Sequence, residues 1–188
     1  MHPSFLVKKI IAENLLPKPV HALDLGCGEG ADAIALAMMG HEVDAIDRHG
    51  ESITVLNQKS RNLKINARQQ TIESFSITPR QYGLVVANNS LPFLSDKGLI
   101  QSKLADMFNG LGQNGVVAFS LFGPKDGWGN NTNIALFNEK ELEQVSKSFP
   151  GKTYYQSTEE GYGLTVRKRL KFWHLFRFIG VKSDNLQV

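Results

Sequence analysis

Three closely spaced glycines and a distant carboxylic acid are the residues of this sequence best suited to bind a cofactor. Gly26, Gly28 and Gly30 follow the apolar run 22–25 and precede a helical pattern. Glycines let the backbone turn tightly and let a ligand approach without a Cβ in its way. Asp47 ends the next apolar run, about twenty residues later, where an acid binds a ribose diol in dinucleotide folds. This spacing predicts a site for a nucleoside-containing cofactor.

Two kinds of cofactor fit this layout. A nicotinamide dinucleotide prefers Gly-x-Gly-x-x-Gly before a helix N-terminus, and here Ala31 holds the place of the third glycine. Asp24 and Glu29 flank the turn, and their negative charge opposes a pyrophosphate but suits a cation. S-adenosylmethionine carries a sulfonium and an amino group and no phosphate. The acids therefore favour S-adenosylmethionine, with a nicotinamide oxidoreductase as the alternative.

Short apolar runs alternate with amphipathic stretches along most of the chain. We predict helices at 5–16, 31–39, 51–62, 96–108 and 139–148, and strands at 22–25, 42–47, 68–71, 83–87, 115–122, 152–156 and 170–182. This alternation implies a parallel sheet covered on both faces, and the last strand pair, which lacks a crossover helix, implies antiparallel pairing. The expected fold is α/β, Rossmann-like and doubly wound, with a mostly parallel seven-stranded sheet and an antiparallel C-terminal strand.

The length of 188 residues predicts one domain spanning 1–188. Within it we expect an N-terminal cap helix in 1–19 and a cofactor-binding core in 20–122. Residues 123–188 would supply an acceptor-side loop, a helix and a strand pair. The polar loop 122–133 directly follows a strand, and ligands of open α/β sheets sit at the carboxyl ends of strands. We therefore expect this loop to touch a ligand.

The segment 22–47 resembles motif I of the class I S-adenosylmethionine-dependent methyltransferases, which have an acid followed by Gly-x-Gly-x-Gly. Residues 82–94 are similar to that family's fourth strand and following loop, and 112–122 to its fifth strand. The ending 171–176 looks like the small, single-domain bacterial branch near the tellurite-resistance-type methyltransferases. The resemblance implies S-adenosyl-L-methionine as methyl donor and S-adenosyl-L-homocysteine as product.

The resemblance also implies which residues bind the cofactor. The turn would line its methionine part and ribose, and Asp24 would support the turn and reach the amino group through water. A plainer interpretation is that Asp24 only ties the loop to a backbone amide. Asp47 would bind the ribose hydroxyls, with Arg48 stacking nearby. The full predicted set is Asp24, Gly26, Cys27, Gly28, Gly30, Asp47, Arg48, Thr71, Ile72, Asn88 and Asn89.

One predicted contact departs from the family pattern. The family places an acid after the third strand to bind the adenine amino group, followed by an apolar residue. Alignment on Phe75 puts Thr71 and Ile72 at these positions, and Thr71 is not an acid. Glu73, two residues further on, is the alternative adenine partner.

Five further residues have both a functional and a structural interpretation. Asn88 and Asn89 would contact the methionine group and face the acceptor, or would simply form a turn. Trp128 would be a lid over the acceptor or a surface aromatic. Arg167, in the basic run 167–171, would bind an anionic acceptor or belong to a solvated turn. His174 would act as a base or be a core histidine held by one hydrogen bond.

Motifs of rival chemistries are missing from the sequence. It has no His-x-x-x-His or Cys-x-x-Cys pair, Gly-x-Ser-x-Gly elbow or phosphate-binding loop, and we expect no metal. The Asn/Asp-Pro-Pro-Tyr signature of amino-group methyltransferases is also missing. We interpret Cys27 as a small buried filler. We assign no catalytic residue, because displacement at an activated sulfonium mainly requires alignment of the reactants.

Composition and charge limit the kinds of partner and the location that we expect for this protein. The net charge of +3 and the pI near 9.0 are mildly basic, and one cysteine allows no internal disulfide. No apolar run approaches the length needed to span a bilayer, and no signal peptide is seen, so we expect a cytoplasmic protein. We predict methyl transfer to a small, anionic or soft acceptor by a monomer or homodimer, with neither nucleic acid nor membrane as partner. The alternatives are an RNA-modifying methyltransferase and a non-catalytic module that binds the cofactor or its product.

Overall fold

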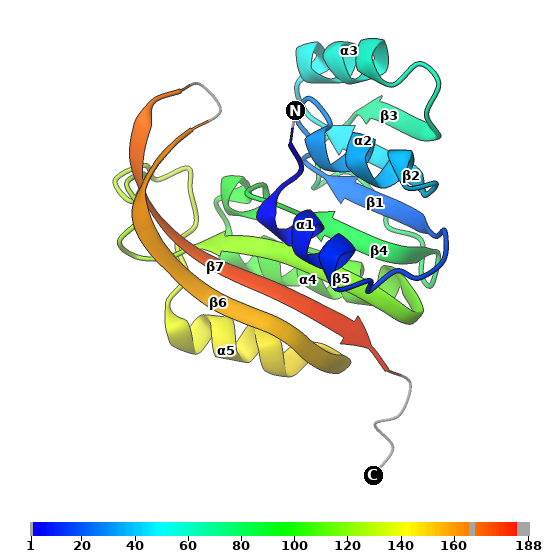
Figure 1. Ribbon diagram of the computed structural model, residues 1–188. Coiled ribbons are helices and arrows are strands. Elements are labelled where there is room, and N and C mark those ends of the chain that lie inside the picture. Colours follow the sequence, from blue (N-terminus) through cyan, green and yellow to red (C-terminus); the bar gives the residue numbers. More distant parts are fainter. Residues whose placement is uncertain (1, 166–167, 184–188) are drawn as a thin grey trace.

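The computed structural model describes residues 2–165 and 168–183, which form one mixed sheet with helices on both faces (Figure 1). The strands are β1 His21–Leu25, β2 Glu42–Asp47, β3 Ile65–Gln69, β4 Tyr82–Ala87, β5 Leu111–Phe122, β6 Gly151–Leu164 and β7 Leu170–Lys182. The helices are α1 Phe5–Ala12, α2 Ala31–Met38, α3 Gly50–Lys59, the 3-10 turn η1 Leu91–Leu94, α4 Lys97–Gly110 and α5 Glu139–Ser148.

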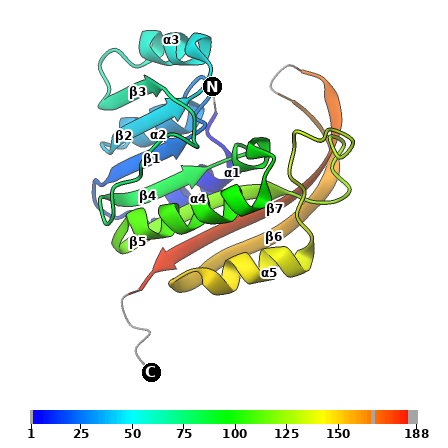
Figure 2. The same cartoon turned by 180° about the vertical axis from the view of Figure 1, so that it is seen from behind.

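The seven strands lie in the order β3-β2-β1-β4-β5-β7-β6. The first five in this order pair in parallel, whereas β7 is antiparallel to both β5 and β6. The predicted fold class is therefore confirmed. β7, the last strand along the chain, lies inside the sheet, and β6 forms the edge (Figure 2).

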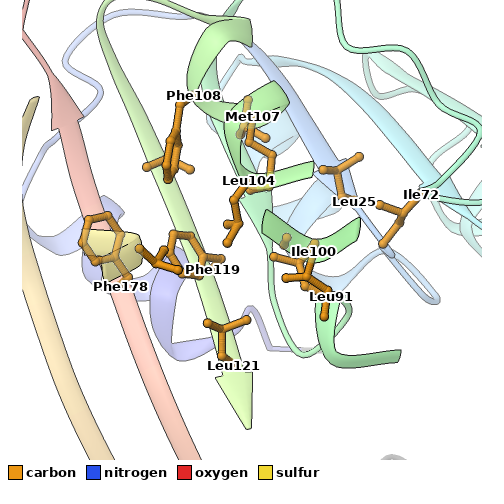
Figure 3. Packing of buried hydrophobic residues seen from close by; sticks show 14 of the residues in the cluster. Leu25, Ile72, Leu91, Ile100, Leu104, Met107, Phe108, Phe119, Leu121 and Phe178 are labelled. Atoms are coloured by element: carbon orange, nitrogen blue, oxygen red, sulfur yellow. The ribbon is translucent and has the colours of Figure 1, made fainter. Parts of the chain in front are cut away.

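Apolar side chains fill both faces of the sheet, as a buried parallel sheet requires. Helices α1, α2 and α3 cover one face through residues such as Leu6, Leu36 and Leu56. Helices α4 and α5 cover the other face, where Leu104 and Phe119 lie in one continuous cluster (Figure 3). Because β1, β2, β4 and β5 run parallel, their carboxyl ends lie at the same edge of the sheet.

Several predicted boundaries were wrong. α1 ends at Ala12 rather than at residue 16, because Asn14 adopts a left-handed backbone with φ of 50°. α3 ends at Lys59, three residues before the predicted end. The third strand lies at 65–69 rather than 68–71, since Thr71 begins a turn that the Phe75 amide closes on the Thr71 carbonyl.

The largest error concerns β6, which extends to Leu164 although we predicted a strand only over 152–156. Its sequence is mostly polar, because as an edge strand it has one neighbour and one largely solvated face. Residue-by-residue pairing with β7, from Gly151 opposite Lys182 to Leu164 opposite Leu170, keeps it extended. Strand β7 itself has the predicted bounds 170–182.

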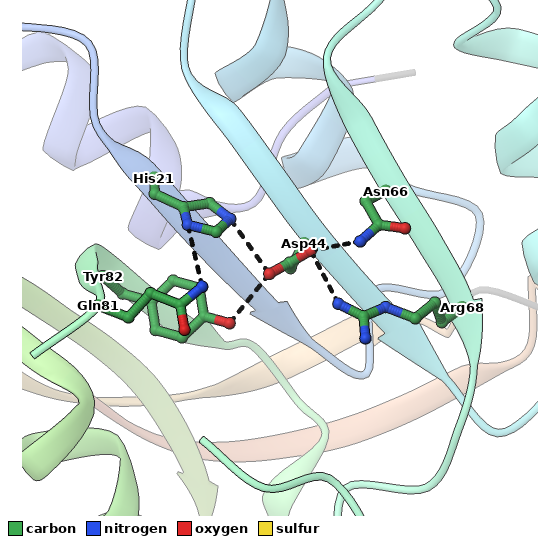
Figure 4. Close-up of polar contacts among 6 residues, drawn as sticks. All are labelled: His21, Asp44, Asn66, Arg68, Gln81 and Tyr82. Carbon is green, nitrogen blue, oxygen red and sulfur yellow. Dashed lines mark hydrogen bonds and ion pairs between the residues drawn. The ribbon is translucent and has the colours of Figure 1, made fainter. Parts of the chain in front are cut away.

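A polar cluster centred on Asp44 covers part of the α4 side of the sheet, near a loop, 70–81, that contains no helix (Figure 4). Asp44 accepts hydrogen bonds from Tyr82, Asn66 and Arg68, and the His21 ring nitrogen lies 3.1 Å away. Burial opposes ionisation, but these hydrogen bonds hold the pKa of Asp44 below its usual value. Because His21 and Tyr82 begin their strands, the cluster lies away from the glycine turn and has a structural role.

Candidate cofactor and acceptor site

The glycine turn is fixed to the carboxyl end of β2 by backbone hydrogen bonds. The amides of Gly26 and Cys27 both donate to the carbonyl of Ile46, at 2.8 and 2.9 Å. The amide of Gly28 donates to Oδ2 of Asp47 at 2.9 Å. The structure thus brings together the predicted turn and the predicted ribose-binding acid.

Gly26 and Gly28 are glycines for different reasons. Both have positive φ, of 76° and 53°. A Cβ on Gly26 would lie 2.4 Å from the Cβ of Ser90, so this glycine lets the loop after β4 pack against the turn. A Cβ on Gly28 would meet no heavy atom of the described residues within 4 Å. Gly28 therefore presents bare backbone to open space, which leaves room for a ligand.

Asp24 is buried beneath this turn with part of its hydrogen-bonding capacity unused. It is 2% exposed, and its Oδ2 has no hydrogen-bond partner among the described residues. Burial, followed by the charge of Asp32, raises its pKa well above the ordinary value. Asp32 accepts the amide of Ser4 at 2.6 Å and so ties the N-terminal segment to α2. A buried carboxylate without a donor is suited to an ammonium group.

Asp47 is oriented by more contacts than the sequence indicated. Its Oδ1 accepts the amide of His49 at 2.8 Å and lies 2.9 Å from Nδ1 of the His49 ring. Sequence reasoning missed His49, because a residue two positions after an acid carries no distinctive signal. The predicted Arg48 is exposed, and its carbonyl accepts Nε2 of Gln69.

Cys27, predicted both to line the cofactor and to be a small buried filler, lies within the glycine turn. Its side chain is half-buried against the α1–α3 core. Burial, with smaller contributions from Asp24 and Asp47, raises the pKa of its thiol. A thiol that resists ionisation is a poor nucleophile.

Of the residues predicted to contact the adenine, only Ile72 lies beside the glycine turn in a suitable way. Ile72 is buried, and its Cδ1 lies 3.5 Å from the position of a Cβ on Gly26, which places it beside the turn. The Thr71 hydroxyl donates to Oγ of Ser74 at 3.0 Å, within its own turn. Glu73 is exposed. Which of Thr71 and Glu73 meets the adenine stays a prediction.

The loop after β4 is held to the neighbouring strands by two serines that sequence reasoning missed. The Asn89 amide donates to Oγ of Ser120 at 2.7 Å, and that hydroxyl donates back to Oδ1 of Asn89 at 2.8 Å. The Ser90 hydroxyl donates to the carbonyl of Leu25. Asn89 has a positive φ of 53°, typical of a turn, and Asn88 is half-buried. These contacts position Asn88 and Asn89 at the carboxyl end of β4.

Four aromatic rings gather beyond the carboxyl ends of β4 and β5, and we call them the aromatic corner: Phe93, Phe122, Trp128 and Trp173. Ring centroids of Trp128 lie 5.5 Å from Trp173, 5.6 Å from Phe93 and 5.7 Å from Phe122. Trp128, predicted as a lid or a surface aromatic, therefore packs down against three rings. Its side chain is half-buried.

A buried ion pair anchors the aromatic corner. Nζ of Lys171 lies 2.6 Å from Oδ1 of Asp126, and Asp126 also accepts the backbone amides of Trp128 and His174. The same Nζ lies 3.4 Å from the centroid of the Trp173 ring, a cation–π distance. Burial lowers the pKa of Lys171, although Asp126 opposes this shift. This pair, 45 residues apart in the chain, joins the loop after β5 to β7.

His174 points to the other face of β7 from Lys171. Its ring is buried, Nδ1 accepts the amide of Lys125 at 3.1 Å, and Nε2 lies 3.6 Å from Glu160. This geometry matches a core histidine held by one hydrogen bond. Arg167, the third predicted acceptor residue, lies outside the described residues. Another cation of this region, Arg177, pairs with Glu159 and lies 4.8 Å from the Phe5 ring.

Residues 2–165 and 168–183 contain no group of three His, Cys, Asp or Glu side chains that could hold a metal ion. None of the helices described is long and apolar enough to cross a membrane.

The fold and the glycine turn define the class of this chain as that of the class I S-adenosylmethionine-dependent methyltransferases. A family profile described as tellurite resistance protein TehB matches residues 7–145, so the chain belongs to the TehB family. The match ends before β6.

Individual relatives agree with this class. A ubiquinone biosynthesis O-methyltransferase from Rickettsia akari is 29% identical over 119 residues, which cover 62% of this chain and 46% of that protein. The chain thus spans less than half the length of this curated relative. The crystal structure of TehB from Haemophilus influenzae superposes with a TM-score of 0.77 at 18% identity, covering 94% of this chain and 62% of that one.

A second similar structure was crystallised with ligands. It is a 1,6-didemethyltoxoflavin-N1-methyltransferase from Burkholderia thailandensis, with bound 1,6-didemethyltoxoflavin and S-adenosylhomocysteine. The TM-score is 0.69 at 17% identity, and the match covers 95% of this chain and 77% of that one. At this identity the likeness concerns the fold.

Proposed function

We propose that this chain transfers the methyl group of S-adenosylmethionine to a small anionic or soft nucleophilic acceptor. The observation that carries the proposal is Asp24, whose buried Oδ2 has no partner among the described residues, directly beneath a turn whose Gly28 faces open space. A cationic ligand would supply the missing donor, and bare backbone leaves room for it. A pyrophosphate would instead meet the carboxyl group of Asp24, whereas Glu29 at the surface is paired with Lys59.

The residues present fit the cofactor. Asp24 would accept the methionine ammonium group, directly or through water, and Asp47 would accept the ribose hydroxyls. The amides of Gly28 and His49 and the His49 ring use up to three of the four acceptor sites of Asp47, so at least one stays free for a ribose hydroxyl. Ile72 would lie against the adenine, and Asn88 and Asn89 would border the methyl group. The bound cofactor would supply an activated methyl group, which an acceptor attacks directly with the thioether as leaving group.

The displacement balances without a further reactant. A lone pair of the acceptor forms the new bond to the methyl carbon, and the electrons of the broken bond return to sulfur as a thioether. A thiolate or a metalloid oxyanion has no proton to lose, so such an acceptor needs no general base. The protein's contribution is then alignment, which can lower a barrier by up to about 7–11 kcal/mol.

The acceptor side favours soft chemistry within this proposal. Lys171 and Arg177 each pair with a carboxylate, so neither is free to neutralise a hard anion. The rings of Trp128 and Phe93 offer a polarisable wall, which suits sulfur or a heavier chalcogen. The small ligand in the Burkholderia neighbour supports an acceptor of low molecular mass.

A calorimetric titration with S-adenosylhomocysteine, run in parallel with NADH, tests the cofactor. We expect saturation by S-adenosylhomocysteine with a micromolar constant, equivalent to about −8 kcal/mol, and no signal with NADH. Binding of NADH alone would overturn the proposal. An acceptor screen led by thiols and metalloid oxyanions, read out as S-adenosylhomocysteine formed, then tests the reaction. Cofactor binding without turnover on any acceptor would indicate a non-catalytic binding module.

A further inference from the structure

Strands β6 and β7 continue past the end of the sheet as a two-stranded arm (Figures 1 and 2). Pairing between β5 and β7 stops at Phe122 opposite Leu175, whereas β6 and β7 stay paired up to Leu164 opposite Leu170. We call residues 160–164 and 170–174 the hairpin arm. The arm also lies beyond residue 145, where the TehB family match ends. What it does therefore does not follow from family membership.

The two faces of the hairpin arm differ in what they touch. Side chains alternate between faces along a strand, and directly paired residues share a face. Lys171 and Trp173 lie on the inner face, where they contact Asp126 and Trp128. The outer face carries Leu164 with its partner Leu170, and Tyr162 with its partner Phe172. The ring centroids of Tyr162 and Phe172 lie 5.3 Å apart.

The apolar side chains of the outer face are largely exposed to solvent. Tyr162 is 76% exposed, Leu170 70% and Leu164 64%. Single exposed apolar residues are common on proteins, but here the strand register places three of them together at one end of the arm. A grouping of this kind marks an interaction surface.

The charge beside these residues is of one sign. The segment 161–171 contains no acidic residue, and of its basic residues Lys171 is paired with Asp126 on the inner face. Lys168 and Arg169 are exposed, next to the Leu164–Leu170 pair. The two acids at the base of the arm are already engaged, because Glu159 pairs with Arg177 and Glu160 with Lys125.

We propose that the hairpin arm docks this protein onto an anionic lipid surface. Leu164, Leu170 and Tyr162 would enter the boundary between headgroups and acyl chains, and Lys168 and Arg169 would contact anionic headgroups. Apolar side chains combined with neighbouring positive charge are what peripheral membrane binding requires.

Charge and chemistry favour this partner over two others. A second copy meeting the arm tip to tip would place Lys168 and Arg169 against their own equivalents, which is repulsive. RNA would use the basic residues and stack on Tyr162, but Leu164 and Leu170 have no aromatic face for a base. Lipid is the partner that uses the leucines and the cations together.

Sedimentation with vesicles tests the proposal on the full chain. We expect binding to vesicles of phosphatidylcholine with phosphatidylglycerol, clearly weaker binding to pure phosphatidylcholine, and release at high salt. The variant Leu164→Ser/Leu170→Ser should lower the partition coefficient about tenfold or more. Lys168→Glu/Arg169→Glu should do the same, since two surface charges are reversed.

Matched variants separate the arm from general charge and apolar content. Arg61→Glu/Lys64→Glu reverses two exposed charges elsewhere, and Met38→Ser removes an exposed apolar side chain on α2. Both should bind vesicles like the wild type. Unchanged S-adenosylhomocysteine affinity would show that the arm variants are folded. Equal binding to both vesicle types, equal losses in the matched variants, arm-dependent self-association without lipid binding, or binding of RNA but not of vesicles would each overturn the proposal.

Discussion

Asp24 and Asp126 are almost equally buried, at 2% and 4% exposure, but their surroundings are opposite. Asp126 receives Lys171 and the amides of Trp128 and His174. Asp24 keeps one oxygen without a partner among the described residues, and its nearest charges, those of Asp32 and Asp47, are negative. A buried carboxylate that finds its hydrogen-bond and ion-pair partners within the protein has a structural role. One that lacks such partners points to a ligand.

The same contrast separates the two ends of the candidate site. At the turn, Gly28 faces open space and Asp24 lacks a donor, so the protein is incomplete where the cofactor is expected. At the aromatic corner, Lys171 is neutralised and Trp128 is packed, so the wall is complete without a ligand. Under the function proposed above, the methyl donor would be recognised by specific polar contacts and the acceptor by shape and polarisability.

The largest expected effect is a loss of stability when the ion-pair partner of Asp126 is removed. Lys171→Met should lower the free energy of unfolding by about 3–5 kcal/mol, because it leaves Asp126 charged and unpaired in the interior. Denaturant unfolding measures the loss. Lys125→Met is the matched control, since its pair with Glu160 is exposed and should cost about 1 kcal/mol or less.

A double variant sharpens this prediction. Asp126→Asn combined with Lys171→Met removes both charges and should recover a substantial part of the lost stability. Affinity for S-adenosylhomocysteine should stay unchanged in the double variant, because the aromatic corner lies on the acceptor side. A single-variant loss no larger than that of Lys125→Met would contradict the assigned role of the buried pair.

The next effect concerns cofactor affinity. Asp47→Ala should weaken S-adenosylhomocysteine binding by about 1.5–3 kcal/mol, the scale of hydrogen bonds to a charged group. Calorimetry measures the change, and thermal unfolding checks that the variant is folded. His49→Ala removes the ring contact but keeps the carboxylate, so it should change affinity far less. Equal affinity in wild type and folded Asp47→Ala would sink the ribose assignment.

The unsatisfied carboxylate predicts opposite effects on binding and stability. The folded-state pKa of Asp24 is raised above its unfolded value, so its contribution to stability is fully present below the unfolded pKa, near 3.9, and is lost as pH rises through the folded pKa. Asp24→Asn abolishes this titration. The stability of the variant relative to wild type should therefore increase from pH 5 to pH 8, as measured by denaturant unfolding.

Cofactor binding should respond in the other direction. Asp24→Asn should weaken S-adenosylhomocysteine binding about tenfold, the difference between a hydrogen bond to a charged and to a neutral acceptor. Wild-type affinity should also fall as pH is lowered through the raised pKa, since a protonated Asp24 loses its attraction for an ammonium group. A flat pH profile of affinity in the wild type would refute this account.

The smallest effect is expected at His174. His174→Asn keeps an acceptor for the Lys125 amide and should cost about 1 kcal/mol or less of stability. Methyl-transfer activity and its pH profile should not change. Loss of an ionisation near neutral pH from the profile, with stability preserved, would instead make His174 a base.

The sequence predicted the fold well, because strand–helix alternation and apolar periodicity are local signals. It predicted β6 poorly, since an edge strand needs little apolar content and is extended by its partner β7 rather than by its own pattern. The third strand was displaced for a related reason: its burial is low, and its bounds are set by pairing with β2.

The candidate site likewise contains contacts that local sequence predicts and contacts that it does not. The link between Gly28 and Asp47 follows from spacing in a known motif, and the structure brings the two together. The pairing of Lys171 with Asp126 joins residues from separate elements, so nothing local marks either residue as half of an ion pair. The hydrogen bonds of Asn89 with Ser120 are hidden for the same reason.

The position of β7 also has a consequence for synthesis of the protein. β7 follows β6 in the chain but lies between β5 and β6 in the sheet. A nascent chain that has emerged from the ribosome only as far as β6 therefore lacks the strand that covers the edge of β5 from Val116 to Phe122. An uncovered edge of this kind is a template for pairing with other chains. Addition of β7 thus completes the sheet and removes this exposed edge.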